Sequence, residues 1–172
     1  VLAVEYPDID YLDGYLTIEG YPAYKLLTGA ARSFDTRILN HRDFIFPLSA
    51  SGRQELTFYL RVQSGDVLLW PMRISTQQDF ADREQAQLLF LGMIVGAMLI
   101  LALYHLFSYA LMGEVRSLLL SVFVMVLTLC VMTTKGLTAQ YLWPNSPYWN
   151  SLALEFLTWL SIFLGTIYLL LF

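Results

Sequence analysis

Polar and aromatic side chains of the kinds that bind sugars or small anions occur throughout the first half of the sequence. A sugar ring has an apolar C–H face and several hydroxyl groups, so a site for it combines an aromatic side chain with hydrogen-bond donors and acceptors. The guanidinium groups of Arg37 and Arg61 can each bind a carboxylate through two parallel hydrogen bonds, or pair with Asp10. The predicted ligand-binding residues are Asp10, Arg37, His41, Arg42, Arg61 and Trp70, together with Asp8. The alternative is that these side chains form structural ion pairs and solvated surface.

No residue pattern typical of catalysis or metal binding accompanies them. The two histidines, His41 and His105, lie in regions with different solvents and cannot share a site. The single cysteine, Cys130, lies in an apolar run, which excludes an intrachain disulfide and a cysteine zinc cluster. The sequence contains no phosphate-binding loop motif, and no nucleophile and base occur at a spacing that is diagnostic of an active site. We therefore predict no catalytic residue, no metal and no cofactor in this chain.

The charges divide the sequence into two regions. Overall the chain is 57% hydrophobic and 14% charged, with a net charge of −4, whereas an ordinary soluble domain is about 25% charged. Residues 1–87 hold eight basic and twelve acidic side chains, and the remainder holds two of each. Two regions in two solvents are the simplest interpretation. The acidic balance argues against a nucleic-acid-binding protein.

Short β-strands are predicted before residue 82. Leu56, Phe58, Leu60 and Val62 alternate with polar or aromatic residues, as in a strand with one buried face. Similar stretches are Tyr11–Ile18, Arg37–Pro47 and Val67–Ser75, separated by turn pairs such as Asp13-Gly14 and Ser51-Gly52. Pro71 cannot donate to a sheet ladder, which predicts an edge strand or a bulge. We expect residues 1–82 to form a partial jelly-roll or β-sandwich domain, with a small α/β domain as the alternative.

Three apolar runs follow and are predicted to be transmembrane helices. They are Leu88–Met112, Leu118–Thr134 and Ser151–Phe172, each within the range of about 17–25 residues that crosses a bilayer. Lipid offers no hydrogen-bond partner to the backbone, so these runs should be helices. We place them at about 87–112, 117–135 and 150–172, in a membrane domain at 83–172. Two Trp and two Tyr between the second and third runs are typical of a membrane–water interface.

A few residues within the spans are candidates for packing or signal coupling. Gly92 and Gly96 match the small-xxx-small pattern of close helix contacts, although such matches are frequent by chance. His105 either contacts a neighbouring helix or couples a signal within the bundle. Glu155 is the only acid inside a span, where it faces either the bundle or the interface.

The order of several short motifs resembles a known receptor family. These motifs are Tyr6–Leu12, Phe34–Arg37, Phe44–Leu48 and Leu60–Ser64, then Phe90-Leu91-Gly92 with Gly96, Leu103–Leu106, Lys135-Gly136 and Gln140–Pro144. In this order they resemble the extracytoplasmic and membrane regions of bacterial seven-transmembrane receptors with diverse intracellular signalling modules. One departure is Gly29-Ala30, where the family usually has Gly-Asp.

The resemblance implies a periplasmic jelly-roll sensor similar to carbohydrate-binding modules, anchored in the bacterial inner membrane. It implies seven spans, three of them here, and a cytoplasmic output such as a histidine kinase or diguanylate cyclase outside this chain. The chain begins at Val1 and ends in an apolar run, so we expect it to be a piece of a longer protein. The expected partners are the lipid bilayer, a carbohydrate or small-molecule ligand, and a second copy in a homodimer.

We expect the polar link Asp79–Gln87 to carry the signal by a population shift between two arrangements. Two rival functions are a membrane-anchored envelope enzyme and a transporter accessory subunit. The first should show a catalytic constellation and the second should show interrupted helices. A structural or assembly protein without a ligand is a third alternative.

Overall fold

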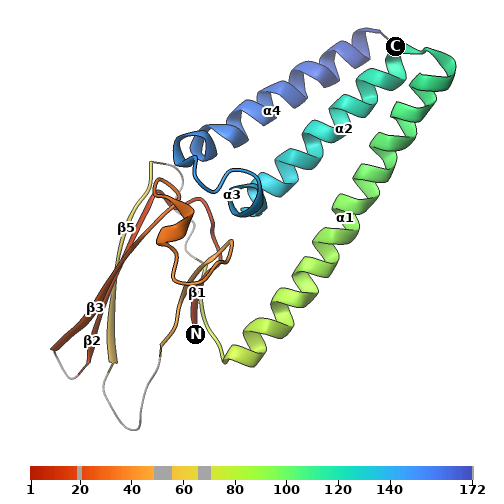
Figure 1. Ribbon diagram of the computed structural model, residues 1–172. Coiled ribbons are helices and arrows are strands. Elements are labelled where there is room, and N and C mark those ends of the chain that lie inside the picture. The colour runs from red at the N-terminus through yellow and green to blue at the C-terminus, as the bar shows by residue number, and fades with distance from the viewer. Residues whose placement is uncertain (19–20, 49–55, 66–70, 172) are drawn as a thin grey trace. The chain divides into compact units, whose positions relative to one another are not determined.

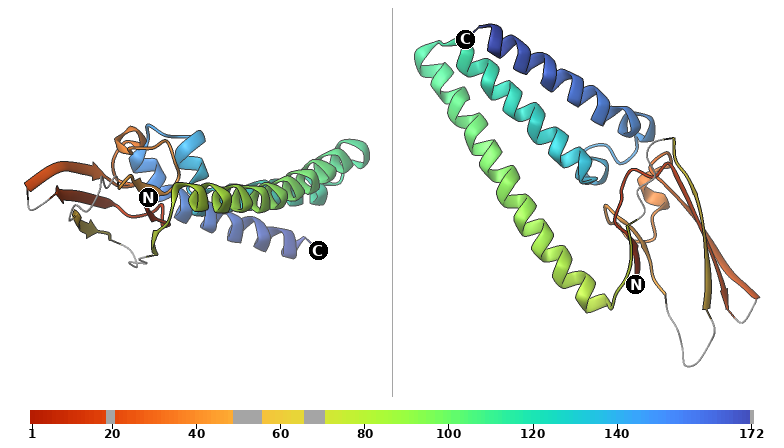
Figure 2. Two further views of the ribbon diagram at one scale, coloured as in Figure 1. Left: turned by 90° about the horizontal axis from the view of Figure 1, so that it is seen from below. Right: turned by 180° about the vertical axis from the view of Figure 1, so that it is seen from behind.

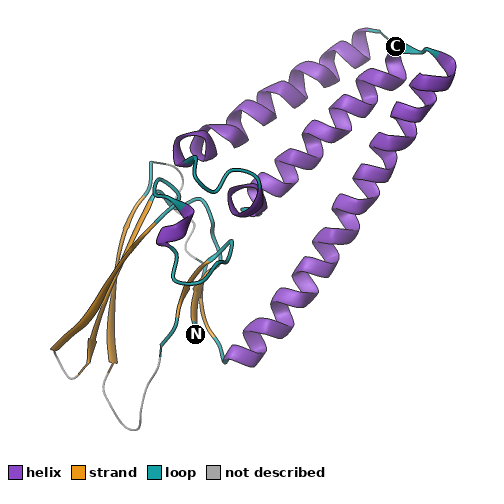
Figure 3. Cartoon of the chain, in the orientation of Figure 1, coloured by secondary structure: helices purple, strands orange, loops and turns teal. Residues whose placement is uncertain are grey.

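The chain is described from a computed structural model covering residues 1–18, 21–48, 56–65 and 71–171 (Figure 1). These residues form two compact units. The first holds Val1–Phe80 and Lys135–Ser151, and the second holds Ala81–Thr134 and Leu152–Phe172. All the strands lie in the first unit, whereas the second consists of helices (Figure 3).

The first unit contains two three-stranded antiparallel sheets. The first sheet has the order β4 (Phe44–Phe46), β1 (Leu2–Val4) and β6 (Met72–Ile74), and the second has the order β3 (Tyr21–Thr28), β2 (Tyr11–Ile18) and β5 (Leu56–Gln63). The apolar core between them comprises Leu2, Val4, Ile9, Leu12, Phe44 and Phe46. A β-rich first domain followed by three helices long enough to cross a membrane confirms the predicted fold class.

Strand β5 shows why the alternating pattern was informative. Phe58, Leu60 and Val62 pack against the core, whereas Tyr59 and Arg61 are exposed on the opposite face. Successive side chains in a strand point to opposite faces, so one face of β5 is apolar and the other is free for binding.

The expected strand over Arg37–Pro47 is mostly absent. Phe34–Thr36 forms a 3₁₀ turn, η1, and only Phe44–Phe46 is extended. The physical reason is Arg37, whose Nη1 donates to the carbonyl oxygens of His41, at 3.0 Å, and Arg42. These two bonds curl the segment around the guanidinium and prevent it from pairing as a strand.

The edge position predicted around Pro71 agrees with the structure. Among the described residues, β6 pairs with β1 and with no other strand, and the Glu5 amide donates to the Pro71 carbonyl at 3.0 Å. The Glu5–Pro71 pair of this antiparallel ladder lacks only the reciprocal bond, which proline cannot donate and which the end of an edge strand tolerates. Strand β3 was not among the predicted stretches, and it pairs with β2 through a bulge between Leu16 and Thr17.

The three long helices are α1 (Gln77–Met112), α2 (Val115–Thr134) and α4 (Pro147–Leu170). All three are long and apolar enough to cross a membrane. Helix α1 starts earlier than the apolar run, so the polar stretch Asp79–Gln87 is its first part. The Thr76 hydroxyl caps this end, because it accepts from the Asp79 amide at 3.1 Å. Pro147 at the start of α4 is favourable, since its fixed φ suits a first helical turn.

Small side chains mark the helix contacts in the second unit. Ser121 of α2 donates its hydroxyl to the Ala102 carbonyl of α1 at 2.8 Å, and both residues are buried. On α4 the buried residues of this unit are Ala153, Leu157 and Ser161. Small and hydroxyl side chains let helices approach closely in lipid and add a hydrogen bond between them.

A short helix, α3 (Leu137–Tyr141), lies between α2 and α4. Figure 2 shows the chain leaving α2, turning through α3 and entering α4. Residues 135–151, termed here the α2–α4 connection, belong to the same compact unit as the sheets.

Candidate functional site

A polar groove lies on the exposed face of the second sheet. It has a volume of about 300 Å³ and is lined by Tyr11 and Asp13 of β2, Arg61 and Gln63 of β5, and Arg32. The strand register creates it, because Asp13 lies opposite Arg61 and Tyr11 lies opposite Gln63. Its volume is at the lower end of the range for small-molecule sites, about 300–1,000 Å³.

Arg32 and Asp13 form the fixed part of the groove. Arg32 Nη1 lies 2.6 Å from Asp13 Oδ1 and also donates to the Thr28 carbonyl at 2.8 Å. The Asp13 residue is only 8% exposed, so the guanidinium neutralises a nearly buried carboxylate. The same guanidinium lies 5.2 Å from the centre of the Tyr11 ring. This arrangement holds Arg32 in one orientation.

Arg61 supplies a second guanidinium group to the groove. It is exposed and makes no hydrogen bond or ion pair with the described residues. Two guanidinium groups and one carboxylate leave the groove with a net positive charge. A planar guanidinium with free donors is suited to a carboxylate or another small oxyanion.

Aromatic side chains extend the same face of the sheet. Tyr15 lies opposite Tyr59 in the register, and Tyr59 is 60% exposed. Lys25 Nζ lies 5.3 Å from the centre of the Tyr15 ring. Aromatic rings beside charged donors and an amide provide the two kinds of surface that a sugar with an acidic group would contact.

Of the predicted ligand-binding residues, Arg61 lines this groove. Arg37 instead lies between the rings of Phe34 and Phe44, at 4.5 Å and 4.3 Å from their centres. Burial lowers the pKa of Arg37 to about 10, and nearby Asp43 partly opposes the shift. The group therefore remains charged at neutral pH, and its contacts organise the segment from Phe34 to Phe44.

The other predicted residues also contact their own surroundings. His41 Nδ1 accepts from the Asp43 amide at 2.9 Å, and Arg42 is buried with Nε 3.8 Å from Asp43 Oδ2. Asp10 Oδ2 accepts from the Gly65 amide at 2.7 Å. Asp8 is half-buried, and Trp70 lies outside the described residues.

Sequence reasoning missed Tyr11, Asp13, Arg32 and Gln63. A signal for two of them was present, because Tyr11 and Asp13 alternate with Leu12 in a predicted strand and must share a face. The pairing of this strand with β5, 45 residues downstream, could not be read from the sequence. The position of Arg32, beyond the end of β3, depends on the tertiary structure alone.

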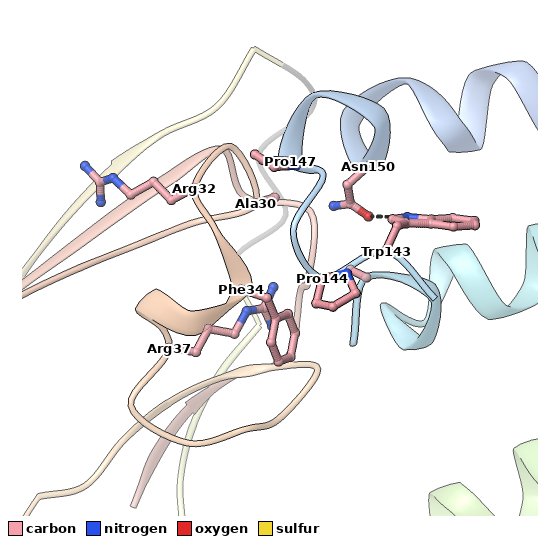
Figure 4. A pocket seen from close by; sticks show the side chains of 9 residues that line it. Ala30, Arg32, Phe34, Arg37, Trp143, Pro144, Pro147 and Asn150 are labelled. Carbon is pink, nitrogen blue, oxygen red and sulfur yellow. Dashed lines mark hydrogen bonds between the residues drawn. The ribbon is translucent and has the colours of Figure 1, made fainter. Parts of the chain in front are cut away.

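A second feature of this unit is the contact between the sheets' loops and the α2–α4 connection (Figure 4). The Phe34 amide donates to the Pro144 carbonyl at 3.3 Å, and Gln140 Nε2 donates to the Asn40 carbonyl at 3.1 Å. The remaining hollow, of about 10 Å³, is lined by Ala30, Arg32, Phe34, Arg37, Ala139, Trp143, Pro144, Pro147 and Asn150. Space for about one water makes this a packed contact rather than a ligand pocket.

The candidates within the spans are placed as follows. A Cβ added to Gly92 or Gly96 would meet no described atom within 4 Å, so neither lies at a close helix contact in this chain. His105 is half-buried beside the Tyr104 ring, at 5.2 Å between centres. Glu155 is exposed on α4, eight residues after Pro147. Their roles in packing or coupling stay predictions.

Comparison with known proteins gave two family matches that together span most of the chain. Residues 1–76 match the family described as 7TMR-DISM extracellular 2. Residues 87–172 match the family described as 7TM diverse intracellular signalling. No curated protein and no solved structure matches the chain.

Proposed function

Because this chain belongs to the seven-transmembrane receptors with diverse intracellular signalling modules, we propose that its β domain senses a ligand and that its helices pass the signal to a cytoplasmic output module. The output is a histidine kinase, a diguanylate cyclase or a related enzyme that follows in the receptor. The membrane is the bacterial inner membrane, with the β domain in the periplasm.

The observation that carries this proposal is the groove between β2 and β5. It combines the guanidinium of Arg61, an amide on Gln63 and the ring of Tyr11 within one hollow. The ligand we propose is a small sugar or sugar-like molecule. Its hydroxyls would bond to Gln63 and the arginines, and its C–H face would lie against the tyrosines.

The proposed mechanism is a population shift. The receptor exchanges between two arrangements, and a ligand that binds one of them better increases its share. A ligand can shift this equilibrium only by its difference in affinity for the two arrangements. The helix that leaves the β domain, α1, is the covalent route along which that difference reaches the membrane.

Ligand binding to the whole receptor tests the proposal. The receptor is reconstituted in lipid nanodiscs and titrated by calorimetry with neutral hexoses and with the corresponding uronic acids. We expect one of these sugars to bind to the wild type, and Arg61→Gln to weaken its binding while Arg73→Gln, at an exposed position on β6 of the other sheet, does not. Binding of no sugar, or binding that is equal in wild type and Arg61→Gln, would contradict the groove as a sugar site.

A further inference from the structure

We propose that the α2–α4 connection is a second route by which the β domain controls the membrane helices, and that Arg32 joins this route to the groove. This second route does not depend on the ligand being the sugar proposed above. Its use in signalling rests on the proposed receptor function. The route passes from the groove to Arg32, to η1, to the connection, and so to the ends of α2 and α4.

Gly136 shows how closely the connection approaches the β domain. A Cβ at this position would lie 2.7 Å from Pro7 Cβ and 3.4 Å from Arg42 Cβ. Real Cβ atoms essentially never come as close as the first distance, so a side chain would force the two segments apart. Gly136 also has a φ of 70°, which favours glycine.

Two hydrogen bonds tie the rest of the connection to the same domain. The Phe34 amide donates to the Pro144 carbonyl, and the Gln140 side chain donates to the Asn40 carbonyl. The partners are about 100 residues apart in sequence, and the hollow around Phe34 and Pro144 holds about 10 Å³. Because this contact is closely packed, a displacement of the loop at Phe34 is passed on to the connection at Pro144 rather than absorbed between them.

Arg32 belongs to both sites. It lines the groove and also lines the hollow at the connection. In Figure 4 its side chain extends away from Trp143 and Pro144. The Arg32 guanidinium donates to Asp13 Oδ1 in the groove, at 2.6 Å. Arg32 precedes Phe34 by two residues. A ligand that competes for the Arg32 guanidinium would therefore shift the backbone that contacts Pro144.

The connection is stiff enough to act on the helices. The amides of Leu142 and Trp143 both donate to the Thr138 carbonyl, at 2.9 and 3.0 Å, and the Ser146 amide donates to the Trp143 carbonyl at 3.2 Å. Trp143 Nε1 also donates to Asn150 Oδ1 at 3.4 Å. The connection starts directly after α2 ends at Thr134, and α4 begins within it at Pro147. Movement of the connection must therefore move one end of each helix.

Hydrogen exchange of the whole receptor in nanodiscs tests this route without a ligand. Arg32→Ala removes the shared residue, and Arg61→Ala is the matched control because it lines the groove alone. We expect amide exchange in residues 138–150 to become at least about three-fold faster in Arg32→Ala and to stay unchanged in Arg61→Ala. Unchanged exchange in Arg32→Ala, or equal acceleration in both variants, would overturn the proposal.

Glycine variants test the route from the other side and guard against loss of folding in Arg32→Ala. Gly136→Ala should accelerate exchange in residues 30–37, because the added methyl group pushes against Pro7. Gly113→Ala is the control: it has the same φ of 70° but no atom within 4 Å of the added Cβ. Equal behaviour of the two variants would overturn the proposal. Because no ligand is needed, failure here is distinct from failure of the sugar-binding test.

Discussion

At the residue scale, the arginines of the β domain have three different roles. Arg32 is paired with Asp13, Arg37 is held between two rings, and Arg61 makes no hydrogen bond or ion pair with the described residues. Residue type alone does not separate these roles, since each arginine could fork onto a carboxylate. A ligand can therefore bind Arg61 without breaking a contact between Arg61 and the described part of the chain.

Arg61→Gln is expected to weaken binding of a uronic acid by about 10- to 100-fold, because a charge-assisted hydrogen bond contributes about 1.5–3 kcal/mol. Binding of the neutral hexose should change less, since it lacks the carboxylate. Calorimetry on wild type, Arg61→Gln and the control Arg73→Gln measures the difference. A loss of the same size for both sugars would assign Arg61 a structural role instead.

Arg37→Ala is expected to lower the free energy of unfolding by about 2–3 kcal/mol, because the carbonyls of His41 and Arg42 lose a charged donor. The pKa of Arg37 is lowered to about 10, so the group is charged in both the folded and unfolded states below pH 9. The loss should therefore not depend on pH between 6 and 9. Above pH 10 the folded state releases the proton of Arg37 before the unfolded state does. The free energy of unfolding of the wild type should therefore rise with pH in that range. Thermal unfolding of Arg37→Ala, with Arg61→Ala as the exposed control, checks both statements.

At the element scale, α1 is a single helix from the β domain into the apolar run. The polar stretch Asp79–Gln87 forms its first turns, and Thr76 caps it. A continuous helix transmits rotation and translation, whereas a flexible linker would absorb them. The structure thus supplies the link for which the sequence suggested only a polar, helix-tolerant segment.

Insertions into α1 test whether its rotation carries the signal. One alanine inserted after Asp82 turns the following residues by about 100°, whereas seven residues restore the face to within about 20°. We expect the first insertion to change the receptor's basal output and the second to leave it close to wild type. Both insertions should retain ligand binding. A basal output that is the same for both insertions would argue against a rotary link.

At the scale of the whole molecule, the β domain and the α2–α4 connection form one compact unit. We therefore expect both to lie on the same side of the membrane, with the turn at Gly113-Glu114 on the other side. The charges of the short loops did not decide this orientation. Contact between distant segments decides which loops share a side, and the assignment of that side to the periplasm is part of the proposed function.

Labelling with a membrane-impermeant maleimide tests this arrangement. Single cysteines are introduced as Asn145→Cys and Glu114→Cys in a Cys130→Ser background. In spheroplasts we expect labelling at position 145 and protection at position 114 until the membrane is opened. Labelling at both positions in intact spheroplasts would contradict the arrangement of the spans, and the reverse pattern would place the β domain in the cytoplasm.

The sequence by itself determined that the chain has one region suited to water and one suited to lipid. It also determined the three candidate spans and the strand with one apolar face. These are local properties, because hydrophobic run length and period-2 alternation depend only on neighbouring residues. The order of its motifs also pointed to the receptor family that the comparisons then showed. Arg61 was predicted as a ligand-binding residue from its type alone, because a guanidinium group can bind a carboxylate, and this role stays a prediction.

Only the tertiary structure decided which side chains meet. Strand register brought Asp13 of β2 opposite Arg61 of β5, and a turn beyond β3 brought Arg32 to Asp13. The approach of Gly136 to Pro7 joins segments 129 residues apart and has no local signal. Such pairings depend on packing the whole unit into one core, so no window of the sequence contains them.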